Sequence, residues 1–425
     1  MRRAIILVLD GLRRDMIAAD LTPTLVAHAA HADTFGRHRS VFPSATRVVS
    51  SSLATGCHPA RHELAGNSLA LLEDGRLVAH DAGHPGFLQH KRRVTGRSLA
   101  MPTLAERLAG RGGAVIYSNV SPGAAYAHDP DGHGTVYHRA GSYGPGRLPV
   151  TGWTADRISA DIAGDRAMAD RFIEDVVLGG GKPALGVLWL AEPDLSSHAH
   201  PLGSPGQLAA VRAADAIAAL VIAAVGKARD AGDDILLVVA SDHGHQTVAG
   251  VIDIDSELVG AGLKGAPGSG DVLAVSNGTS ALIYVHPDHA DRAPAIGSFL
   301  ATRSWAGDVI GVDRLAEFGQ APRHGLTFAV VMAATDEANA HGIRGMSFVA
   351  KPEAGKPDRL GCGQHGGLAD YEQAPFLMIS GPGFTAGAKH NSPSSAIDIA
   401  PTVLRHLGIA HEPLDGRALQ ATDQP

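Results

Sequence analysis

The chain contains few cysteines and few aromatic residues. Cys57 and Cys362 are the two cysteines among 425 residues, and they lie far apart in the sequence. Two cysteines exclude the disulfide framework that holds many small secreted domains together, and we expect both to be reduced thiols. Aromatic residues make up 4% of the chain, so the core has to be built mainly from Ala, Val, Leu and Ile.

Long apolar runs and an excess of positive charge are also missing. The apolar run from Ala4 to Leu9 stops at Asp10, which makes it shorter than the roughly 7–15 apolar residues of a secretory signal. Elsewhere no stretch approaches the roughly 18 uninterrupted apolar residues of a membrane span. We therefore expect a cytoplasmic protein without a membrane partner. The formal net charge of −7 argues against a protein that binds nucleic-acid polymers.

Short apolar runs alternate with Ala-rich helical patterns along the chain. Four runs are bounded by Gly, Asp or Asn and are apolar on both faces, as expected of buried parallel strands; they span Ala4–Leu9, Ala114–Tyr117, Leu185–Leu190 and Ile235–Ala240. Helical patterns span Met101–Arg111 and Gln207–Ala231. The alternation predicts an α/β fold with a doubly wound, mainly parallel sheet flanked by helices.

Residues 251–360 differ from the rest of the chain. Gly260–Gly270 is a Gly-rich break, Ala281–Val285 and Thr327–Met332 have the pattern of strands, and His341–Pro352 is loop-rich. We expect a smaller α+β cap at 251–360, inserted between two parts of a catalytic core at 1–250 and 361–425. A second loop-rich region, Val120–Gly152, is predicted to line a substrate entrance.

Polar residues follow each predicted strand, where the chemistry of an open α/β sheet is normally found. Asp10 ends the first strand, Asn119 follows the second, and the third and fourth are followed by Glu192 and Asp194 and by Asp242 and His243. A single Asp after a strand is more often a helix cap, and a single Asp-His pair is usually solvated. Their repetition at successive strand ends favours a metal site instead.

Two further histidines extend this pattern. His198 lies four residues after Asp194, and His365 lies in a Gly-Gln-His-Gly-Gly segment. Carboxylate oxygens combined with imidazole nitrogens suit zinc or a similar first-row ion better than calcium or an iron–sulfur centre.

Thr46 ends a polar loop and begins a segment of small residues with a helical pattern. A hydroxyl at a helix N-terminus lies near the positive end of the helix dipole, which favours developing negative charge. The local sequence by itself favours a purely structural role for Thr46, as the cap of that helix.

Together these residues resemble the alkaline phosphatase superfamily and, within it, the type I phosphodiesterase/nucleotide pyrophosphatase family. In that family a nucleophilic Thr lies nine residues before a Thr-Gly pair and twenty-one before an Asn. Thr46, Thr55-Gly56 and Asn67 reproduce both intervals. The Asp and His clusters occur in the family's order, and the tail Ile397–Thr402, followed by Asp415-Gly416-Arg417, resembles the C-terminal signature.

The resemblance implies an alkaline phosphatase-like fold, a phosphothreonine intermediate on Thr46 and two divalent metal ions. Zinc is the first expectation for the metal, with manganese and iron as alternatives. One ion would be held by Asp194, His198 and His365. The other would be held by Asp10, Asp242, His243 and the Thr46 oxygen. Asn67 would contact a phosphoryl oxygen of the substrate.

The sequence departs from the family pattern next to the nucleophile. Arg47 follows Thr46 where the family usually has an aromatic residue, and Arg47 either pairs with a phosphate oxygen or points away along the helix. Cys57 begins a Cys-x-Pro-x-Arg pattern like that of sulfatases. The sulfatase cysteine precedes the Thr-Gly pair, however, whereas Cys57 follows it. We therefore expect Cys57 to be a small buried residue.

Three functions are compatible with these residues. The first is a metal-dependent phosphodiesterase or nucleotide pyrophosphatase acting on a small phosphorylated substrate. The second is a phosphate monoesterase or a phosphonate hydrolase, such as a phosphonoacetate hydrolase, using the same site. The third is a non-catalytic, metal-binding scaffold, although such a scaffold has no need of a nucleophile. The oligomeric state is not readable from the sequence.

Overall fold

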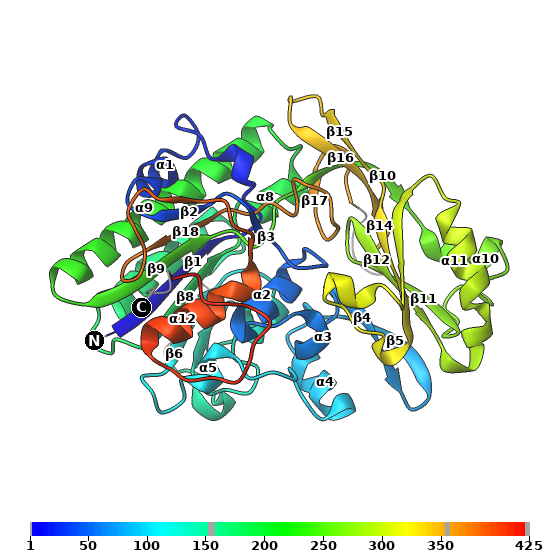
Figure 1. The fold of residues 1–425 in the computed structure, drawn as a ribbon, viewed down its shortest axis with the longest axis horizontal. Helices are drawn as coiled ribbons and strands as arrows, with labels where there is room; N and C mark the ends of the chain where they lie inside the picture. The colour runs from blue at the N-terminus through cyan, green and yellow to red at the C-terminus, as the bar shows by residue number, and fades with distance from the viewer. Residues whose placement is uncertain (1, 152–157, 353–357, 421–425) are drawn as a thin grey trace.

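The computed structural model describes residues 2–151, 158–352 and 358–420. Its largest element is an eight-stranded sheet (Figure 1). The spatial order of the strands is β19 (Lys389–His390), β2 (Asp33–Phe35), β18 (Leu377–Ser380), β9 (Asp234–Ala240), β1 (Arg2–Leu9), β8 (Leu185–Leu190), β6 (Ala114–Ser118) and β7 (Thr135–Tyr137). The strands from β9 to β7 pair in parallel, and β18 pairs antiparallel with both β9 and β2. The mainly parallel sheet expected from the sequence is confirmed.

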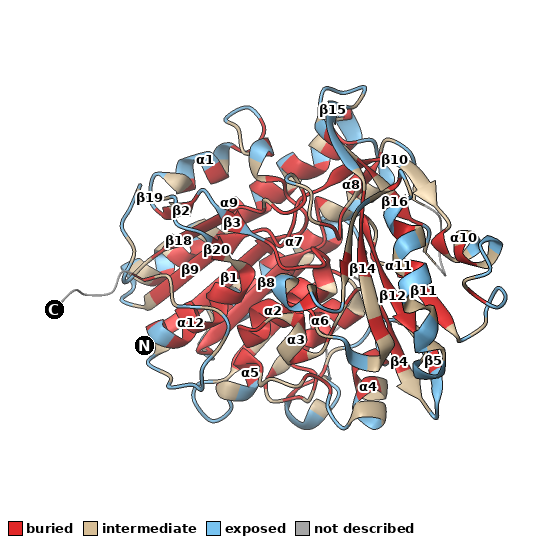
Figure 2. Cartoon of the chain, turned by 45° about the vertical axis from the view of Figure 1, so that its right-hand side comes forward, coloured by how far each residue is buried: buried red, intermediate tan, exposed pale blue. Residues whose placement is uncertain are grey.

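Both faces of this sheet are buried, which explains the unbroken apolar runs of its central strands, such as Ala4–Leu9 in β1 and Ile235–Ala240 in β9. Alternate residues of β1 point to opposite faces, so Ile5 and Leu7 join one core cluster while Ile6 and Val8 join the other. One face is covered by α1 (Pro23–Ala29), α7 (Ile162–Phe172) and α9 (Pro205–Asp230). The other is covered by α2 (Thr46–Thr55), α5 (Leu104–Arg107), α6 (Pro122–Ala127) and α12 (Ile399–Leu407). Figure 2 shows the buried residues concentrated between these layers.

The helix predicted at Gln207–Ala231 is confirmed as α9, whereas the helix predicted at Met101–Arg111 is too long. Its helical part, α5, has only four residues. Pro102 precedes the helix, and the Thr103 side chain accepts a hydrogen bond from the Glu106 N–H at 3.2 Å, so the helix begins after this cap. After α5 the chain turns at Gly110, whose φ of +71° is unfavourable for most residues.

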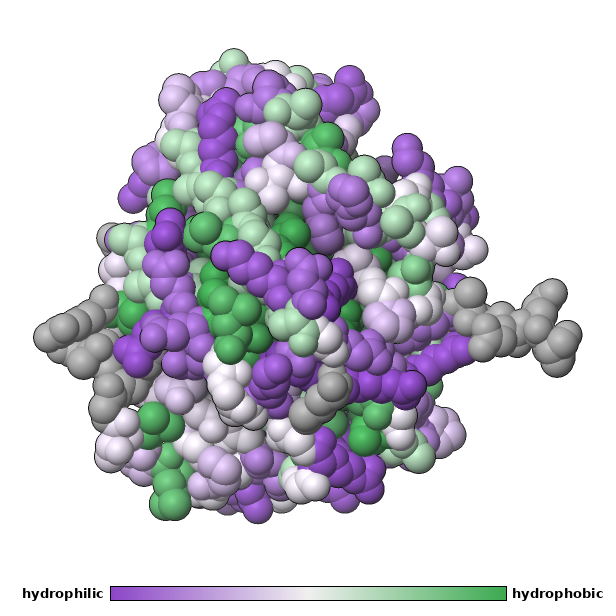
Figure 3. Space-filling model, turned by 90° about the vertical axis from the view of Figure 1, so that its left-hand side faces the viewer, coloured by the Kyte–Doolittle hydropathy of each residue, from purple (hydrophilic) through white to green (hydrophobic). Residues whose placement is uncertain are grey.

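The length and composition of α9 alone would allow it to cross a membrane, but half of its most apolar window is buried inside the protein. Core helices of this length pass the same test, so the helix is weak evidence for a membrane span. On the face drawn in Figure 3, hydrophilic residues are interspersed among the hydrophobic ones.

A second lobe lies beside the carboxyl ends of the central strands (Figure 1). Its antiparallel sheet has the order β11 (Val272–Ser276), β12 (Ser280–Val285), β14 (Leu326–Met332) and β13 (Ala306–Gly311). Its own core includes residues of α10 (Ile254–Gly260) and α11 (Ala293–Ala301). The strands predicted at Ala281–Val285 and Thr327–Met332 therefore exist as β12 and β14.

Another four-stranded sheet connects the two lobes. Its order is β15 (Ala334–Ala338), β16 (Arg344–Ala350), β10 (Gln246–Ile252) and β17 (Gly363–Gln364). The prediction that His341–Pro352 is loop-rich is wrong, because β16 occupies most of it. β16 pairs with β10, a partner distant in the sequence, and no local pattern reveals such a pairing. The division of the chain at residues 250 and 361 stays a prediction.

Smaller elements complete the two lobes. The hairpin of β4 (Ser68–Glu73) and β5 (Arg76–Asp81) packs against β11 of the second lobe. β3 (His38–Arg39) pairs with β20 (Ser394–Ser395). Within the described residues, the remaining α-helices are α3 (Pro59–His62), α4 (Phe87–Thr95) and α8 (Asp194–Ala199). Cys57 and Cys362 are buried and unbonded.

Candidate active site

The carboxyl ends of three adjacent strands place the predicted ligands at one edge of the central sheet. Asp10 directly follows β1, Asp242 and His243 follow β9, and Asp194 begins α8 shortly after β8. Because β9, β1 and β8 are parallel neighbours, their carboxyl ends meet at the same edge. The structure thus brings together residues that are up to about 230 positions apart.

The first group of candidate ligands is the Asp10 cluster, which we define as Asp10, Asp242 and His243. The Nε2 atom of His243 lies 3.4 Å from Asp10 Oδ1, 3.2 Å from Asp242 Oδ2 and 3.2 Å from the Thr46 hydroxyl oxygen. The other carboxylate oxygens are already engaged. Asp10 Oδ2 accepts a hydrogen bond from the buried indole of Trp189 at 2.9 Å, and Asp242 Oδ1 accepts one from the Gly11 N–H at 3.0 Å.

Two carboxylate oxygens of this cluster, Asp10 Oδ1 and Asp242 Oδ2, are buried and have no hydrogen-bond partner among the described residues. Burial raises the pKa of Asp10 well above its ordinary value, and the charge of Asp242 adds to this shift. Burial also raises the pKa of Asp242, to about 7. Buried, unpaired carboxylates are costly unless they are neutralised. A divalent cation between these oxygens would supply the missing charge, so the residues fit a metal site.

The second group is the Asp194 cluster, which we define as Asp194, His198, His245 and His365. The Nε2 atoms of the three histidines all lie close to Asp194 Oδ1. The distances to this oxygen are 3.3 Å for His198, 2.9 Å for His245 and 3.6 Å for His365. Each Nδ1 atom lies 2.8–2.9 Å from a backbone carbonyl oxygen, those of Gly363, Gly11 and Ser44 respectively. Metal-binding histidines are commonly oriented by such a contact of the second ring nitrogen.

The pKa values in the Asp194 cluster are shifted by burial and by the close contacts between its members. Burial lowers the pKa of His198, but the charge of Asp194 outweighs this and raises it to about 9. Burial would raise the pKa of Asp194, yet the surrounding histidines hold it well below its ordinary value. In His365, burial and the neighbouring His243 lower the pKa. Asp194 is therefore an anion surrounded by imidazoles, as expected of a metal ligand.

His245 belongs to this cluster and was not predicted from the sequence. Its ring is held between two glycines. A Cβ atom on Gly11 would lie 2.4 Å from the ring carbon Cε1, and one on Gly363 would lie 2.8 Å from Cδ2. Gly11 also has a φ of +65°, which favours glycine. The signal in the sequence was the second His of Asp242-His243-Gly244-His245, whose proximity to Asp194 becomes visible only in the fold.

Thr46 is the first residue of α2 and is 8% exposed. Its hydroxyl contacts His243, as described above, and so lies beside the Asp10 cluster. Asn67 lies next to it, because its Oδ1 accepts a hydrogen bond from the Arg47 N–H at 3.0 Å. With Oδ1 committed in this way, the Asn67 amide group keeps its N–H donors for a ligand.

Arg47 lines the cavity instead of pointing away along α2. Its Nε donates to Ser121 Oγ at 3.2 Å, and Nη1 donates to the Asn67 carbonyl oxygen at 3.4 Å. Nη2 lies 3.5 Å from Asp81 Oδ1. The guanidinium packs so closely on Gly83 that a Cβ there would lie 2.2 Å from Nη2. Arg47 thus forms a fixed cationic wall of the site.

Cys57 lies at the other end of α2 from Thr46. It follows Gly56, the left-handed residue that ends the helix, and is fully buried. Ten helical residues separate the two ends by about 15 Å. Cys57 is therefore a small core residue, as expected, and the sulfatase-like pattern has no access to this site.

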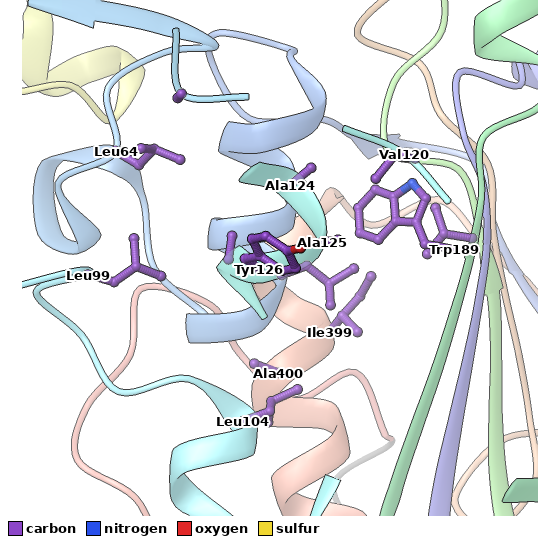
Figure 4. Packing of buried hydrophobic residues seen from close by; sticks show 14 of the residues in the cluster. Leu64, Leu99, Leu104, Val120, Ala124, Ala125, Tyr126, Trp189, Ile399 and Ala400 are labelled. Atoms are coloured by element: carbon purple, nitrogen blue, oxygen red, sulfur yellow. The ribbon is translucent and has the colours of Figure 1, made fainter. Parts of the chain in front are cut away.

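Both clusters open into a cavity of about 560 Å³. Its walls come from the central sheet edge, the hairpin β4–β5, the second lobe and the predicted entrance loop, and its lining includes Asn67, Asp81, Arg139, Asn277 and Asp358. Within the entrance loop, Val120, Ser121 and Arg139 line the cavity, whereas Gly152 lies outside the described residues. Trp189, which bonds to Asp10, packs beside Val120 in the core below (Figure 4).

Two buried carboxylates that the sequence did not single out support the loops of the site. Asp165 accepts hydrogen bonds from the N–H groups of Ala191 and Glu192, each at 2.9 Å, just before Asp194. Glu372 accepts one from the Gly367 N–H at 2.8 Å, just after His365. Burial raises the pKa of both carboxyl groups to about 7. Each lies in the middle of a local sequence without a recognisable pattern.

Comparisons with known proteins identify the family and the fold. The family model for type I phosphodiesterase/nucleotide pyrophosphatase matches residues 4–298. No curated protein sequence matches the chain. Murine ectonucleotide pyrophosphatase/phosphodiesterase 5 is similar in structure, with a TM-score of 0.69 and 16% identity, over 98% of this chain and 97% of that chain. An inactive variant of the same murine protein, in complex with AMP, gives the same values. The human protein has a TM-score of 0.68 at 16% identity and the same coverage.

At 16% identity these structures establish the fold, which is the predicted alkaline phosphatase-like fold. The family follows from the sequence match, because the matched segment spans more than half of the chain. The chain belongs to the type I phosphodiesterase/nucleotide pyrophosphatase family, whose members are hydrolytic enzymes.

Proposed function

We propose that this protein hydrolyses phosphate diesters or nucleotide pyrophosphates and that Thr46 is its nucleophile. The observation that carries the proposal is the position of the Thr46 hydroxyl. Thr46 is the first residue of helix α2. Its hydroxyl oxygen lies 3.2 Å from His243 Nε2, and the residue lines the cavity beside the Asp10 cluster. The helix N-terminus favours a developing alkoxide. Its attack on phosphorus would form a Thr46 O–P bond and break the P–O bond to the leaving alcohol or phosphate, and water would then hydrolyse the phosphothreonine intermediate.

The two clusters would hold two divalent cations. Asp10, Asp242, His243 and the Thr46 oxygen form one set of ligands, and Asp194, His198 and His365 form the other. The mixture of imidazole and carboxylate supports zinc, and manganese or iron fit the same donors. Cations in these positions would lower the pKa of the Thr46 hydroxyl and neutralise charge on the phosphoryl group.

Asn67 and Arg47 would bind the substrate. The free N–H donors of Asn67 would contact a phosphoryl oxygen. The Arg47 guanidinium is already engaged by Ser121, the Asn67 carbonyl and Asp81, so little of its charge is left for a dianionic monoester. This favours a diester over a phosphate monoester or a phosphonate. AMP in the complex of the murine protein supports a nucleotide as the small substrate of this chain. A cytoplasmic location remains part of the proposal.

The nucleophile is tested with Thr46→Ala on metal-replete protein. We expect turnover of a nitrophenyl phosphodiester to fall by roughly 1,000-fold or more, with metal content unchanged. Thr46→Ser keeps a hydroxyl and should retain measurable activity. Thr55→Val removes a buried hydroxyl at the far end of the same helix and serves as the control. Wild-type turnover in Thr46→Ala would refute the assigned nucleophile.

The substrate class is tested by comparing wild-type kcat/KM for the nitrophenyl diester and the nitrophenyl monoester under the same conditions. We expect the diester to be the better substrate. A faster monoester would overturn the preferred subclass but leave Thr46 as nucleophile.

A further inference from the structure

Outside the active site, three metal-ligating side chains converge on the hairpin β4–β5 and helix α4. We define this hairpin cluster as Glu73, His80 and His90. The His80 Nε2 atom lies 2.6 Å from Glu73 Oε1, and the His90 Nε2 atom lies 2.9 Å from the same oxygen. The three ligand atoms lie within 4.8 Å of one another. All three side chains are partly buried.

The register of the hairpin is compatible with this contact between Glu73 and His80. In the hairpin, Leu69 pairs with His80 and Glu73 pairs with Arg76. Directly opposed residues share a face of an antiparallel pair, and so do residues two apart along a strand, which places Glu73 and His80 on the same face. His90 is added by α4, which is anchored by the buried Phe87 and Leu88. The His80 and His90 rings lie 4.8 Å apart.

The donor set is that of a transition-metal site. Two imidazole nitrogens and one carboxylate oxygen are common zinc ligands, and a fourth position remains for water. Zinc bonds of about 2.0–2.1 Å separate tetrahedral ligand atoms by about 3.3 Å. The two separations from Glu73 Oε1, 2.6 Å and 2.9 Å, are shorter than this value by less than 1 Å, so small side-chain rotations would suffice. Among the described residues no Lys or Arg forms an ion pair with Glu73, so no fixed cation competes for its charge.

We propose that Glu73, His80 and His90 bind a zinc ion, separate from the cations of the active site. This ion would fasten the end of β5 to α4. His80 and its neighbour Asp81 both line the active-site cavity, and Asp81 contacts Arg47. Metal at the hairpin cluster would therefore rigidify the cavity wall that positions Arg47. The proposal does not depend on the assigned reaction.

Zinc titration of chelator-treated protein tests this site. We expect wild type to bind one zinc equivalent more than His90→Gln, measured by calorimetry and by metal analysis after gel filtration. His90 does not line the cavity, so the active-site ions should remain in this variant. His84→Gln changes an exposed histidine of the adjoining loop and should bind as much zinc as wild type. Equal stoichiometry and identical isotherms for wild type and His90→Gln would overturn the proposal.

A second measurement distinguishes metal binding from simple hydrogen bonding within the cluster. Zinc should slow amide hydrogen exchange in β5 and α4 of the wild type and of Thr46→Ala, but not in His90→Gln or Glu73→Gln. If zinc also slows exchange in Thr46→Ala, zinc binding at the hairpin cluster is independent of the proposed nucleophile. Unchanged exchange in the wild type on zinc addition would count against the site, even if all variants fold.

Discussion

His245 contributes to the site through another residue, Asp194, which it contacts at 2.9 Å. His245→Ala should weaken zinc binding at the Asp194 cluster by roughly 10–100-fold, the usual cost of losing an outer partner of a metal ligand. His245→Gln can still donate a hydrogen bond to Asp194 and should recover part of this loss. Competition with a chromophoric chelator measures both affinities.

The control for this prediction is His200→Gln, which changes an exposed histidine directly after α8, the helix that begins at Asp194. It should leave zinc affinity unchanged. If His245→Ala bound zinc as tightly as the wild type, the contact with Asp194 would have no role in organising the ligands.

At the residue scale, the sequence identified most of the side chains that meet in the candidate site. Asp10, Asp194, Asp242 and His243 follow strands or turns that local patterns identify, and the structure brings them together. His245, Asp165 and Glu372 were missed because their roles depend on neighbours far along the chain. The side-chain direction of Arg47 was also unreadable, because Ser121, Gly83 and Asp81 decide it.

At the scale of elements, the turn after β1 depends on Gly11. Its φ of +65° costs an L-residue roughly 1–2 kcal/mol. A Cβ atom there would also collide with His245. We expect Gly11→Ala to lower stability by about 1–3 kcal/mol and to weaken zinc binding. Thermal unfolding and zinc titration measure the two effects.

Two comparisons separate backbone strain from the collision. Gly110→Ala shares a positive φ, +71°, but has open space around its Cβ position, so it should show only the backbone cost. The ring collision is absent in a His245→Ala background, so adding Gly11→Ala there should cost less than in the wild type. Additive losses in the double variant would show that Gly11 acts through its φ alone.

Element boundaries were less predictable than element types. The apolar runs of β1, β6, β8 and β9 stand out because both faces of each strand are buried. The helix predicted at 101–111 was cut to α5 by the cap at Thr103 and the turn at Gly110. β16 was missed because its composition is typical of a loop. It forms a strand by pairing with β10, which is distant in the sequence.

At the scale of the whole molecule, the cation proposed for the Asp10 cluster would compete with protons for the same carboxylates. In the metal-free fold the pKa of Asp10 is raised well above its ordinary value, and the pKa of Asp242 is raised to about 7. In an unfolded chain the pKa of an Asp side chain is about 3.9. Between about pH 4 and pH 7 the folded state therefore binds more protons at these groups. Their contribution to the stability of the metal-free protein falls as pH rises.

A bound cation replaces these protons, so metal should stabilise the protein more at high pH. We expect the gain in Tm on zinc addition to be larger at pH 8 than at pH 5.5. The underlying free energy should grow by up to about 1.4 kcal/mol per pH unit for each displaced proton. Thermal scans with zinc and with chelator measure this gain.

The raised pKa of Glu372 is common to the zinc-loaded and the chelator-treated protein, so its effect cancels in the difference between their Tm values. Scans of His90→Gln remove the contribution of the hairpin cluster. An equal gain in Tm at the two pH values would contradict proton–metal competition in the Asp10 cluster.

The sequence by itself determined the α/β class, the central strands and the family, because apolar runs and short motifs with fixed spacings are local properties of the chain. Only the tertiary structure decided which oxygen each histidine faces, where the Arg47 guanidinium lies and which walls enclose the cavity. These features arise from packing between segments hundreds of residues apart, and packing depends on the shapes of both partners. No single stretch of sequence contains that information.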